Sequence, residues 1–395
     1  MTTELRKRVR HLERFTFFVG AVAALAAVWL GWLSPDGIPA AWRFAVFACL
    51  QPAIGSLVFI LIHRLTGGQW IEGLAPFLVA GTRLLPWVWL LALPLLCWPI
   101  AAKTPEHESA SETAGAAITG RWQTAPAALE RTFRHEESRQ LDERLRGYFS
   151  RPMVAMRAGV FAAGFFLLAT GAKRSMTRHD ATRMRWFGPV GLISLVFALH
   201  LFATDWFVLL EPGWYSTGFP LVWITAQALA GLSVALLAAL SLGAEPGAAR
   251  PVKRAPGIDW GNLLLAALMA WTYVAFVQWL IIWSGNLPAE TAWYRHRAAG
   301  GWRWVIAGLA IFGFAVPFAL LLSRRLKRRR WGLASVAALV TLGQLGYTAW
   351  LILPAVLPRE SAGRWLVACT SIAAAALFLN RYAAVAHREA GGVAP

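Results

Sequence analysis

The sequence predicts an all-α integral membrane protein, on the strength of its composition, its long apolar runs and its tryptophans. Of 395 residues, 57% are hydrophobic and only 15% are charged, whereas soluble domains average about 45–50% and about 25%. Trp occurs 22 times, and this residue favours the bilayer interface because its ring is apolar while its N–H needs a polar partner. These observations argue against an ordinary soluble enzyme.

Long apolar runs indicate how often the chain crosses the bilayer. A helix needs about 20 residues to cross about 30 Å of hydrocarbon. The run that follows the basic N-terminal segment is too long for a signal-peptide core, so we expect it to remain as a span. Ten such runs carry few charges and are expected to span the membrane: 15–33, 44–62, 84–101, 153–170, 187–210, 218–241, 262–284, 304–322, 333–353 and 365–380.

The basic residues predict the orientation of these spans. The chain carries 38 Lys and Arg against 20 Asp and Glu, a net charge of +18. Most of the basic residues, Arg83 among them, fall in alternate loops on the side of the N-terminus, and the loops between hold few, such as Arg43 and Arg297. Positively charged loops stay in the cytoplasm, so both termini are expected there. Charges dispersed along membrane flanks also argue against nucleic-acid binding.

The spans and loops divide the chain into five expected parts. These are a cytoplasmic segment at 1–14, spans one to three within 15–101, an outer loop at 102–152, spans four to ten within 153–380, and a cytoplasmic tail at 381–395. The second part of the outer loop has Glu and Arg four residues apart, which predicts a surface helix. That helix either caps the bundle or docks a partner subunit.

Cysteine and histidine are too sparse to hold a redox centre. Cys49, Cys97 and Cys369 lie far apart, without the paired spacing of a disulfide framework, a zinc site or an iron–sulfur cluster. Only His200 is plainly mid-membrane, so a bis-histidine haem would lack its second ligand. No nucleotide-binding or hydrolase motif is present. We therefore expect no covalently attached cofactor and no metal ligation.

Ionisable groups inside hydrocarbon are costly, so each is a candidate for function. Asp205 is expected to be the main buried proton-carrying carboxylate, with His200 and Gln278 as relay or hydrogen-bonding neighbours. His200 and Asp205 lie about 140° apart round a helix, so they do not share a face. A lone intramembrane histidine is more often a hydrogen-bonded core residue than a ligand. Other candidate proton carriers lie near the span ends: Glu211 and Glu290 on the outer side, His63 and Glu72 on the cytoplasmic side.

Two outer turns, 205–217 and 283–294, combine carboxylates, amides or hydroxyls and aromatic rings. If spans five and seven pack together, these turns would form an amphipathic pocket able to hold a flat ring and exchange protons. Pro-Gly turns with Trp and Tyr belts also occur in membrane proteins without such a pocket. The candidate pocket residues are Trp206, Trp214, Tyr215, Trp283, Asn286, Trp293 and Tyr294.

Those two turns, together with 63–70 and 148–157, resemble in order the quinone-binding membrane subunits of alternative complex III, and most closely the second such subunit, the ActF type of the NrfD-like family. The resemblance implies two four-helix bundles, made of spans two to five and six to nine, plus two peripheral helices and cytoplasmic termini. The residues 102–143 depart from the family pattern, as does the small-residue start of span four.

The resemblance also implies a function. The chain would be a bacterial inner-membrane subunit of a quinol:cytochrome c oxidoreductase, supporting quinol oxidation and proton translocation. Quinone or quinol would be its ligand, and its partners would be an iron–sulfur subunit, a multihaem cytochrome c subunit, a second NrfD-like membrane subunit and membrane lipid. The ActF type is thought to contribute chiefly a proton route and a structural partner.

Two other readings stay open. A secondary transporter or stand-alone membrane protein of the same fold predicts discontinuous helices near the bilayer midplane, of which Pro52 and Pro317 are the sequence hints. A membrane acyltransferase would need a paired histidine and acid at one interface, and Glu290 with His296 is the nearest candidate.

Overall fold

The fold is made of helices alone within the part of the chain that the structure describes. The computed structural model describes residues 3–71, 73–97, 150–177, 186–207, 214, 216–242, 256–357 and 360–391. Ten helical segments among them are long and apolar enough to cross a membrane, which confirms the predicted all-α, multi-pass architecture. They are Glu13–Leu33, Pro35–Thr66, Ala75–Leu95, Pro152–Met176, Phe187–Trp206, Phe219–Leu242, Gly257–Gly285, Trp302–Leu322, Arg330–Val356 and Ser361–Glu389.

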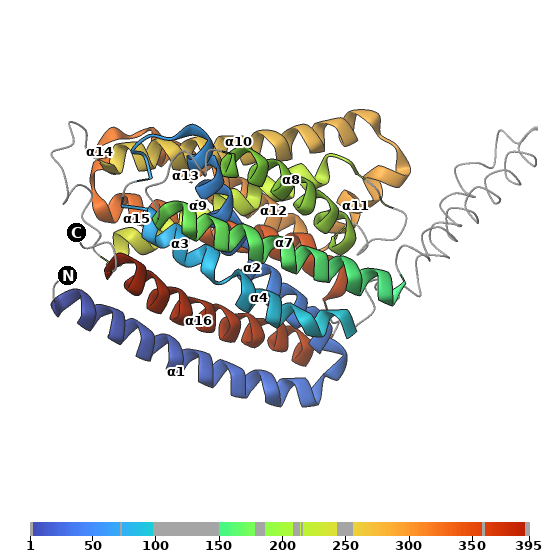
Figure 1. Cartoon of the computed structure of the whole chain (residues 1–395). Coiled ribbons are helices and arrows are strands. Elements are labelled where there is room, and N and C mark those ends of the chain that lie inside the picture. Colours follow the sequence, from blue (N-terminus) through green and yellow to red (C-terminus); the bar gives the residue numbers. More distant parts are fainter. Residues whose placement is uncertain are drawn as a thin grey trace, which may run out of the picture.

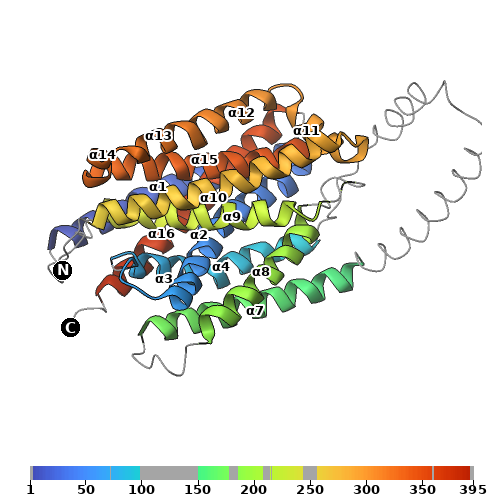
Figure 2. The same ribbon diagram turned by 90° about the horizontal axis from the view of Figure 1, so that it is seen from above.

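Eight of these spans form two groups that lie side by side, with α2 and α9 between the outer members (Figure 2). Bundle one consists of α2 (Ile38–Thr66), α3 (Ala75–Arg83) continued by α4 (Leu85–Ala92) and η2 (Leu93–Cys97), α7 (Arg151–Thr177) and α8 (Phe187–Trp206). Bundle two consists of α9 (Phe219–Leu242), α10 (Pro256–Gly285), the broken span α12 (Trp302–Gly308), η4 (Leu309–Ala315) and α13 (Val316–Leu322), and α15 (Arg330–Val356).

The remaining two spans run along one edge of the molecule. α1 (Thr3–Leu33) packs along α16 (Ser361–Gly391), and α16 in turn packs on α2 and α3 (Figure 1). A short turn, η1 (Pro35–Gly37), joins α1 to α2, while α11 (Pro288–Ala298) and α14 (Arg324–Arg328) cap opposite ends of bundle two. α1 begins and α16 ends at the same end of the molecule in both views.

The two bundles meet where α2 crosses α9 at a pair of glycines. A Cβ atom on Gly55 would lie 1.8 Å from the carbonyl oxygen of Gln227, and one on Gly231 would lie 2.3 Å from the carbonyl carbon of Gly55. Only glycine therefore lets the two backbones approach this closely, a common way for helices to pack in membranes.

The outer face of the peripheral helix α1 is apolar, as a lipid-facing surface should be. Leu25 is 73% exposed and Trp29 is 63% exposed, whereas soluble proteins rarely expose contiguous apolar surface of this kind. This face of α1 is therefore expected to contact the hydrocarbon of the bilayer and not water.

Several predicted boundaries were wrong, and two arginines explain why. Span three begins at Ala75 instead of 84, because Arg83 lies inside it and pairs with Glu389 of α16. Arg43, expected in an outer loop, lies inside α2 and is only 6% exposed. A charge lowers the hydropathy of its window in sequence, but packing and pairing remove most of its cost in the fold.

Other differences lie at the end of the chain and in the outer loop. Span ten was expected to end at 380 and the tail to lie outside it, whereas α16 continues to Gly391. The surface helix expected at 129–148 lies outside the described residues, as does most of the 102–152 loop.

Candidate functional site

The two outer turns that the sequence singled out come together through a pair of tryptophans. The rings of Trp214, just before α9, and Trp293, on α11, stack with centroids 4.9 Å apart and planes 19° apart. The indole Nε1 of Trp214 donates a hydrogen bond of 3.2 Å to the carbonyl of Glu290. Both indoles are almost fully buried. The contact therefore fixes α11 against the end of bundle two that lies opposite α14.

A contact between the first turn and α10 positions the amide of Gln278. Its Nε2 donates a hydrogen bond of 2.6 Å to Oγ of Ser216. A Cβ atom on Gly218 would lie 2.2 Å from Oε1 of Gln278, so a glycine at 218 is what leaves room for this amide. Ser216, in turn, accepts a hydrogen bond from the backbone N–H of Phe219 at the start of α9.

Below this junction lies a cavity of about 690 Å³ within bundle two. The volume falls in the range of about 300–1,000 Å³ typical of small-molecule sites, and so does the mainly apolar and aromatic wall. Gln278 and Thr272 supply polar side chains from α10. The cavity is also lined by large aromatic side chains: Phe219, Trp271, Tyr273, Phe276, Trp279, Trp293, Tyr294, Phe314, Tyr347 and Trp350.

The cavity has one wall that faces the lipid. Tyr273 is 68% exposed and Phe276 is 54% exposed, and both line the cavity from α10. A lipid-soluble molecule can therefore reach the cavity sideways from the hydrocarbon. The wall also includes Leu309 and Phe314 of η4, a π-helical segment. Such π-helical turns are rare and occur frequently at functional sites.

Two polar atoms of the wall have no hydrogen-bond partner among the described residues. They are Nε1 of Trp271 and Oγ1 of Thr272, both buried. An unpaired buried polar group costs about 1–3 kcal/mol. A ligand with oxygen atoms could satisfy both groups, which makes them the natural polar contacts of the cavity.

Arg297 of α11 is the charged group of the site, and sequence reasoning placed it in an outer loop. It is fully buried, with its Cζ 3.9 Å from the centre of the Trp293 ring. Its Nη2 and Nε donate to the carbonyl of Leu351 over 3.0 and 3.2 Å, and Nη1 donates to the carbonyl of Trp293 over 3.3 Å. The four-residue spacing from Trp293 was the available signal, because it stacks the two side chains on one helix face.

Tyr294, a predicted pocket residue, also lines this cavity. Burial raises the pKa of its phenol above the ordinary value, while the charge of Arg297 acts in the opposite direction. The phenol is therefore neutral near pH 7 and can either donate or accept a hydrogen bond. Together with Tyr347 it places two phenols in the wall beside Arg297.

Asp205, expected to carry protons, lies instead in bundle one and is held by an arginine. Its Oδ2 accepts a hydrogen bond of 2.8 Å from Nε of Arg157 on α7, and its side chain is 3% exposed. The sequence predicted the burial but treated the carboxylate as a group without a cationic partner. Any proton taken up by Asp205 must therefore weaken this ion pair.

The other proposed relay residues are not joined to Asp205. His200 is half-buried on α8, and its imidazole makes no hydrogen bond to another residue that the structure describes. His63, at the end of α2, packs edge-on against Trp70 with ring centroids 5.4 Å apart. Glu72 and Glu211 lie outside the described residues. Among the candidates that the structure describes, no continuous chain of proton carriers can be traced.

Four of the predicted pocket residues that the structure describes lie outside the bundle-two cavity. Trp214 stacks on Trp293, which lines the cavity, but does not line it itself. Trp206 lines a smaller cavity in bundle one and packs against Phe202. Trp283 is 65% exposed and stacks on Trp279. Asn286 is exposed, with a left-handed φ of 46° in the turn before α11.

The last two predicted residues at the outer turns have different outcomes. Glu290 joins the site through its backbone carbonyl, which accepts the Trp214 bond, and its side chain is half-buried. Tyr215 lies outside the described residues.

No known family model matches this chain. No curated protein matches it either.

Proposed function

We propose that the chain is a membrane subunit of a quinol:electron-acceptor oxidoreductase of the alternative complex III type, and that its bundle-two cavity receives the quinol or quinone ring. The observation that carries this proposal is the cavity of about 690 Å³, which joins an aromatic wall to Gln278 and to the unpaired N–H of Trp271. A quinone needs flat apolar walls for its ring and hydrogen-bond donors for its oxygens, and this wall supplies both.

The helix arrangement supports the same proposal. Two groups of four spans with a peripheral pair are the grouping that the NrfD-like resemblance implies. The arginines of α14 lie at the end where α1 begins and α16 ends, which favours a cytoplasmic location for both termini. A bacterial inner membrane is part of the proposal.

Quinol oxidation releases two electrons and two protons. The sequence offers no ligand set for a metal centre of this chain's own, so the electrons would pass to a partner, an iron–sulfur subunit or a multihaem cytochrome c. Gln278, Trp271 and Thr272 would hold the ring oxygens, while Arg297 sets a positive potential at the outer end of the cavity. Asp205 would act as a proton carrier in bundle one. A second NrfD-like membrane subunit would be a further partner in the complex.

A second candidate function, secondary transport, rests on the two interrupted spans. Span three breaks at Leu84 between α3 and α4, and span eight passes through the π-helix η4 before Pro317. Transporters place such breaks opposite each other around one central site. Here the breaks belong to different bundles, and only η4 lines the cavity of bundle two. Pro52, the other sequence hint, lies within the continuous helix α2.

The test is purification of the tagged chain from its native membrane in a mild detergent, followed by quinone extraction. We expect a multihaem cytochrome and an iron–sulfur protein to copurify, with quinone bound. Trp271→Phe, which removes the indole N–H and keeps an aromatic side chain, should lower the quinone content. Trp89→Phe is the matched control, because Trp89 also has an unpaired buried N–H but lines the bundle-one cavity. An isolated chain without quinone would refute the proposal.

A further inference from the structure

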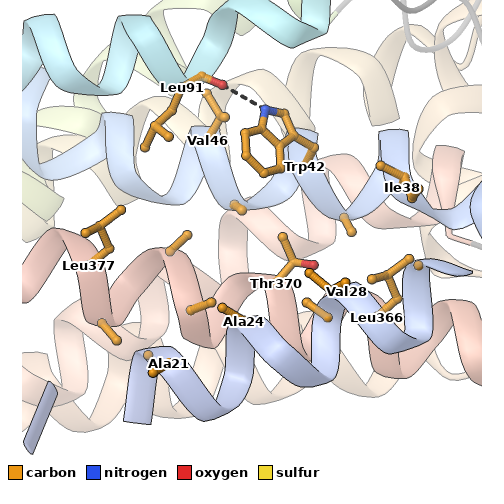
Figure 3. A pocket seen from close by; sticks show the side chains of 18 of the residues that line it. Ala21, Ala24, Val28, Ile38, Trp42, Val46, Leu91, Leu366, Thr370 and Leu377 are labelled. Carbon is orange, nitrogen blue, oxygen red and sulfur yellow. Dashed lines mark hydrogen bonds between the residues drawn. The ribbon is translucent and has the colours of Figure 1, made fainter. Parts of the chain in front are cut away.

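A third cavity, of about 760 Å³, separates α1 from α2 at the edge of the molecule. Helices α1, α2 and α16 form its walls, and Leu91 of α4 closes one side (Figure 3). Small residues create the space, among them Gly20 and Ala24 on α1 and Ala373 on α16. This cavity is distinct from both bundle cavities and takes no part in the function proposed above.

The wall chemistry requires an apolar occupant. The indole N–H of Trp42 is already bonded to the carbonyl of Leu91 over 2.7 Å. Asn380 donates to Oγ1 of Thr16 and to the carbonyl of Glu13, so its amide is also satisfied. The rest of the wall is almost entirely hydrocarbon. Water does not fill apolar cavities of this kind.

The length and volume of the cavity favour a lipid acyl chain over a transmembrane helix as its occupant. The lining residues of α1 extend from Thr16 to Trp32, which corresponds to about 24 Å of helix rise. One leaflet of hydrocarbon is about 15 Å deep, so an acyl chain fits within this length. A transmembrane helix about 10 Å across would occupy about 1,900 Å³ over the same length, more than twice the cavity volume.

The end of the cavity beside the two termini carries positive charge. Arg10 and Arg14 are exposed, and each lies seven residues before a residue that lines the cavity, Phe17 or Ala21. Seven residues are about two helical turns, so the arginines share the face of α1 that borders the cavity. Glu13 is the acidic residue between them, which leaves an excess of positive charge at this mouth.

We propose that this cavity binds one anionic phospholipid, with an acyl chain between α1 and α2 and the headgroup phosphate at Arg10 and Arg14. Long arginine side chains reach the interface from a span end in this way. Anionic lipids are the ligands that clustered basic residues attract at a membrane surface.

The test measures bound lipid by native mass spectrometry of the full chain, purified in mild detergent and then exchanged into nanodiscs of equal phosphatidylglycerol and phosphatidylcholine. We expect one tightly held phosphatidylglycerol. Ala373→Phe, which fills the cavity, should abolish its retention. Ala375→Phe is the matched control, because Ala375 is exposed on the same helix and does not line the cavity.

A double variant tests the headgroup contact without changing the packed core. Arg10→Gln with Arg14→Gln should lower the preference for phosphatidylglycerol at least tenfold while a lipid chain is still retained. Arg325→Gln with Arg328→Gln removes the same charge from α14 and should leave the preference unchanged. Equal lipid retention by the two alanine variants would overturn the site. An unchanged preference in the α1 double variant, or a purified chain that holds no lipid, would overturn it as well.

Discussion

The two bundles each enclose a cavity, but they use their polar groups in opposite ways. In bundle one the cavity is about 330 Å³ and almost wholly apolar, and the charges beside it, Arg157 and Asp205, are bonded to each other. In bundle two the cavity is about 690 Å³, and Gln278, Trp271 and Thr272 line it. The difference suggests that bundle one uses polarity to hold helices together, whereas bundle two presents it to a ligand.

The largest expected effect is on the ion pair of bundle one. Arg157→Met should lower the free energy of unfolding by about 3–5 kcal/mol, because it leaves a buried carboxylate without its partner. Thermal unfolding in detergent measures the loss. Arg83→Met is the control, because it breaks the ion pair with Glu389. The Arg83 side chain is 37% exposed, so we expect the free energy of unfolding to fall by about 1 kcal/mol or less. Equal losses from the two variants would contradict a structural role for the buried pair.

Asp205 itself tests whether bundle one also moves protons. Asp205→Asn keeps the size of the side chain and replaces the carboxylate with an amide that cannot carry a proton, so proton-coupled turnover of the assembled complex should fall at least about tenfold. The ratio of protons released to electrons transferred is the measurement. Unchanged turnover and proton yield would leave Asp205 with a structural role alone.

Arg297 is the buried charged group that stabilises bundle two, as the pair of Arg157 and Asp205 stabilises bundle one. Arg297→Met removes a guanidinium bonded to two carbonyls and stacked on Trp293, and we expect a loss of about 2–3 kcal/mol in the free energy of unfolding. Arg297→Lys should recover only part of it, because an ammonium lacks the planar fork. Full stability of the lysine variant would show that charge alone matters here.

Gln278 separates ligand binding from stability. Gln278→Leu should reduce quinone affinity about tenfold, equivalent to about 1.4 kcal/mol, with little change in thermal unfolding. Gln344→Leu is the control, because Gln344 is also buried but does not line the cavity. Equal quinone binding by both variants would remove Gln278 from the site.

The smallest expected effect compares two glycines. Gly218→Ala should displace the Gln278 amide, since its Cβ would lie 2.2 Å from Oε1, and cost about 1 kcal/mol. Gly159→Ala, at the wall of the bundle-one cavity, meets nothing within 4 Å and should stabilise α7 by about 0.5–1 kcal/mol. A stabilising Gly218→Ala would show that the amide is free to move.

Hydropathy and length were enough to predict ten spans and an all-α fold, because burial in lipid follows from local composition. The role of the two outer turns stays a prediction, and the structure adds that the stack of Trp214 on Trp293 joins them. What sequence could not provide were partners distant along the chain. Two such pairs are Arg83 with Glu389 and Arg157 with Asp205. From the neighbouring sequence alone, Arg83 is predicted to lie in a loop and Asp205 to be an isolated buried charge. Arg297 was missed for the same reason, since its acceptor Leu351 belongs to another span.

The most direct test of the account is photolabelling of the purified complex with an azido-quinone, followed by mapping of the labelled peptides. The account predicts label on α10, α11 and α15, around Trp271, Tyr294 and Tyr347, and competition by unlabelled quinol. Label confined to α2, α4 and α8, around Trp89 and Trp206, would place the ligand in bundle one and contradict the account.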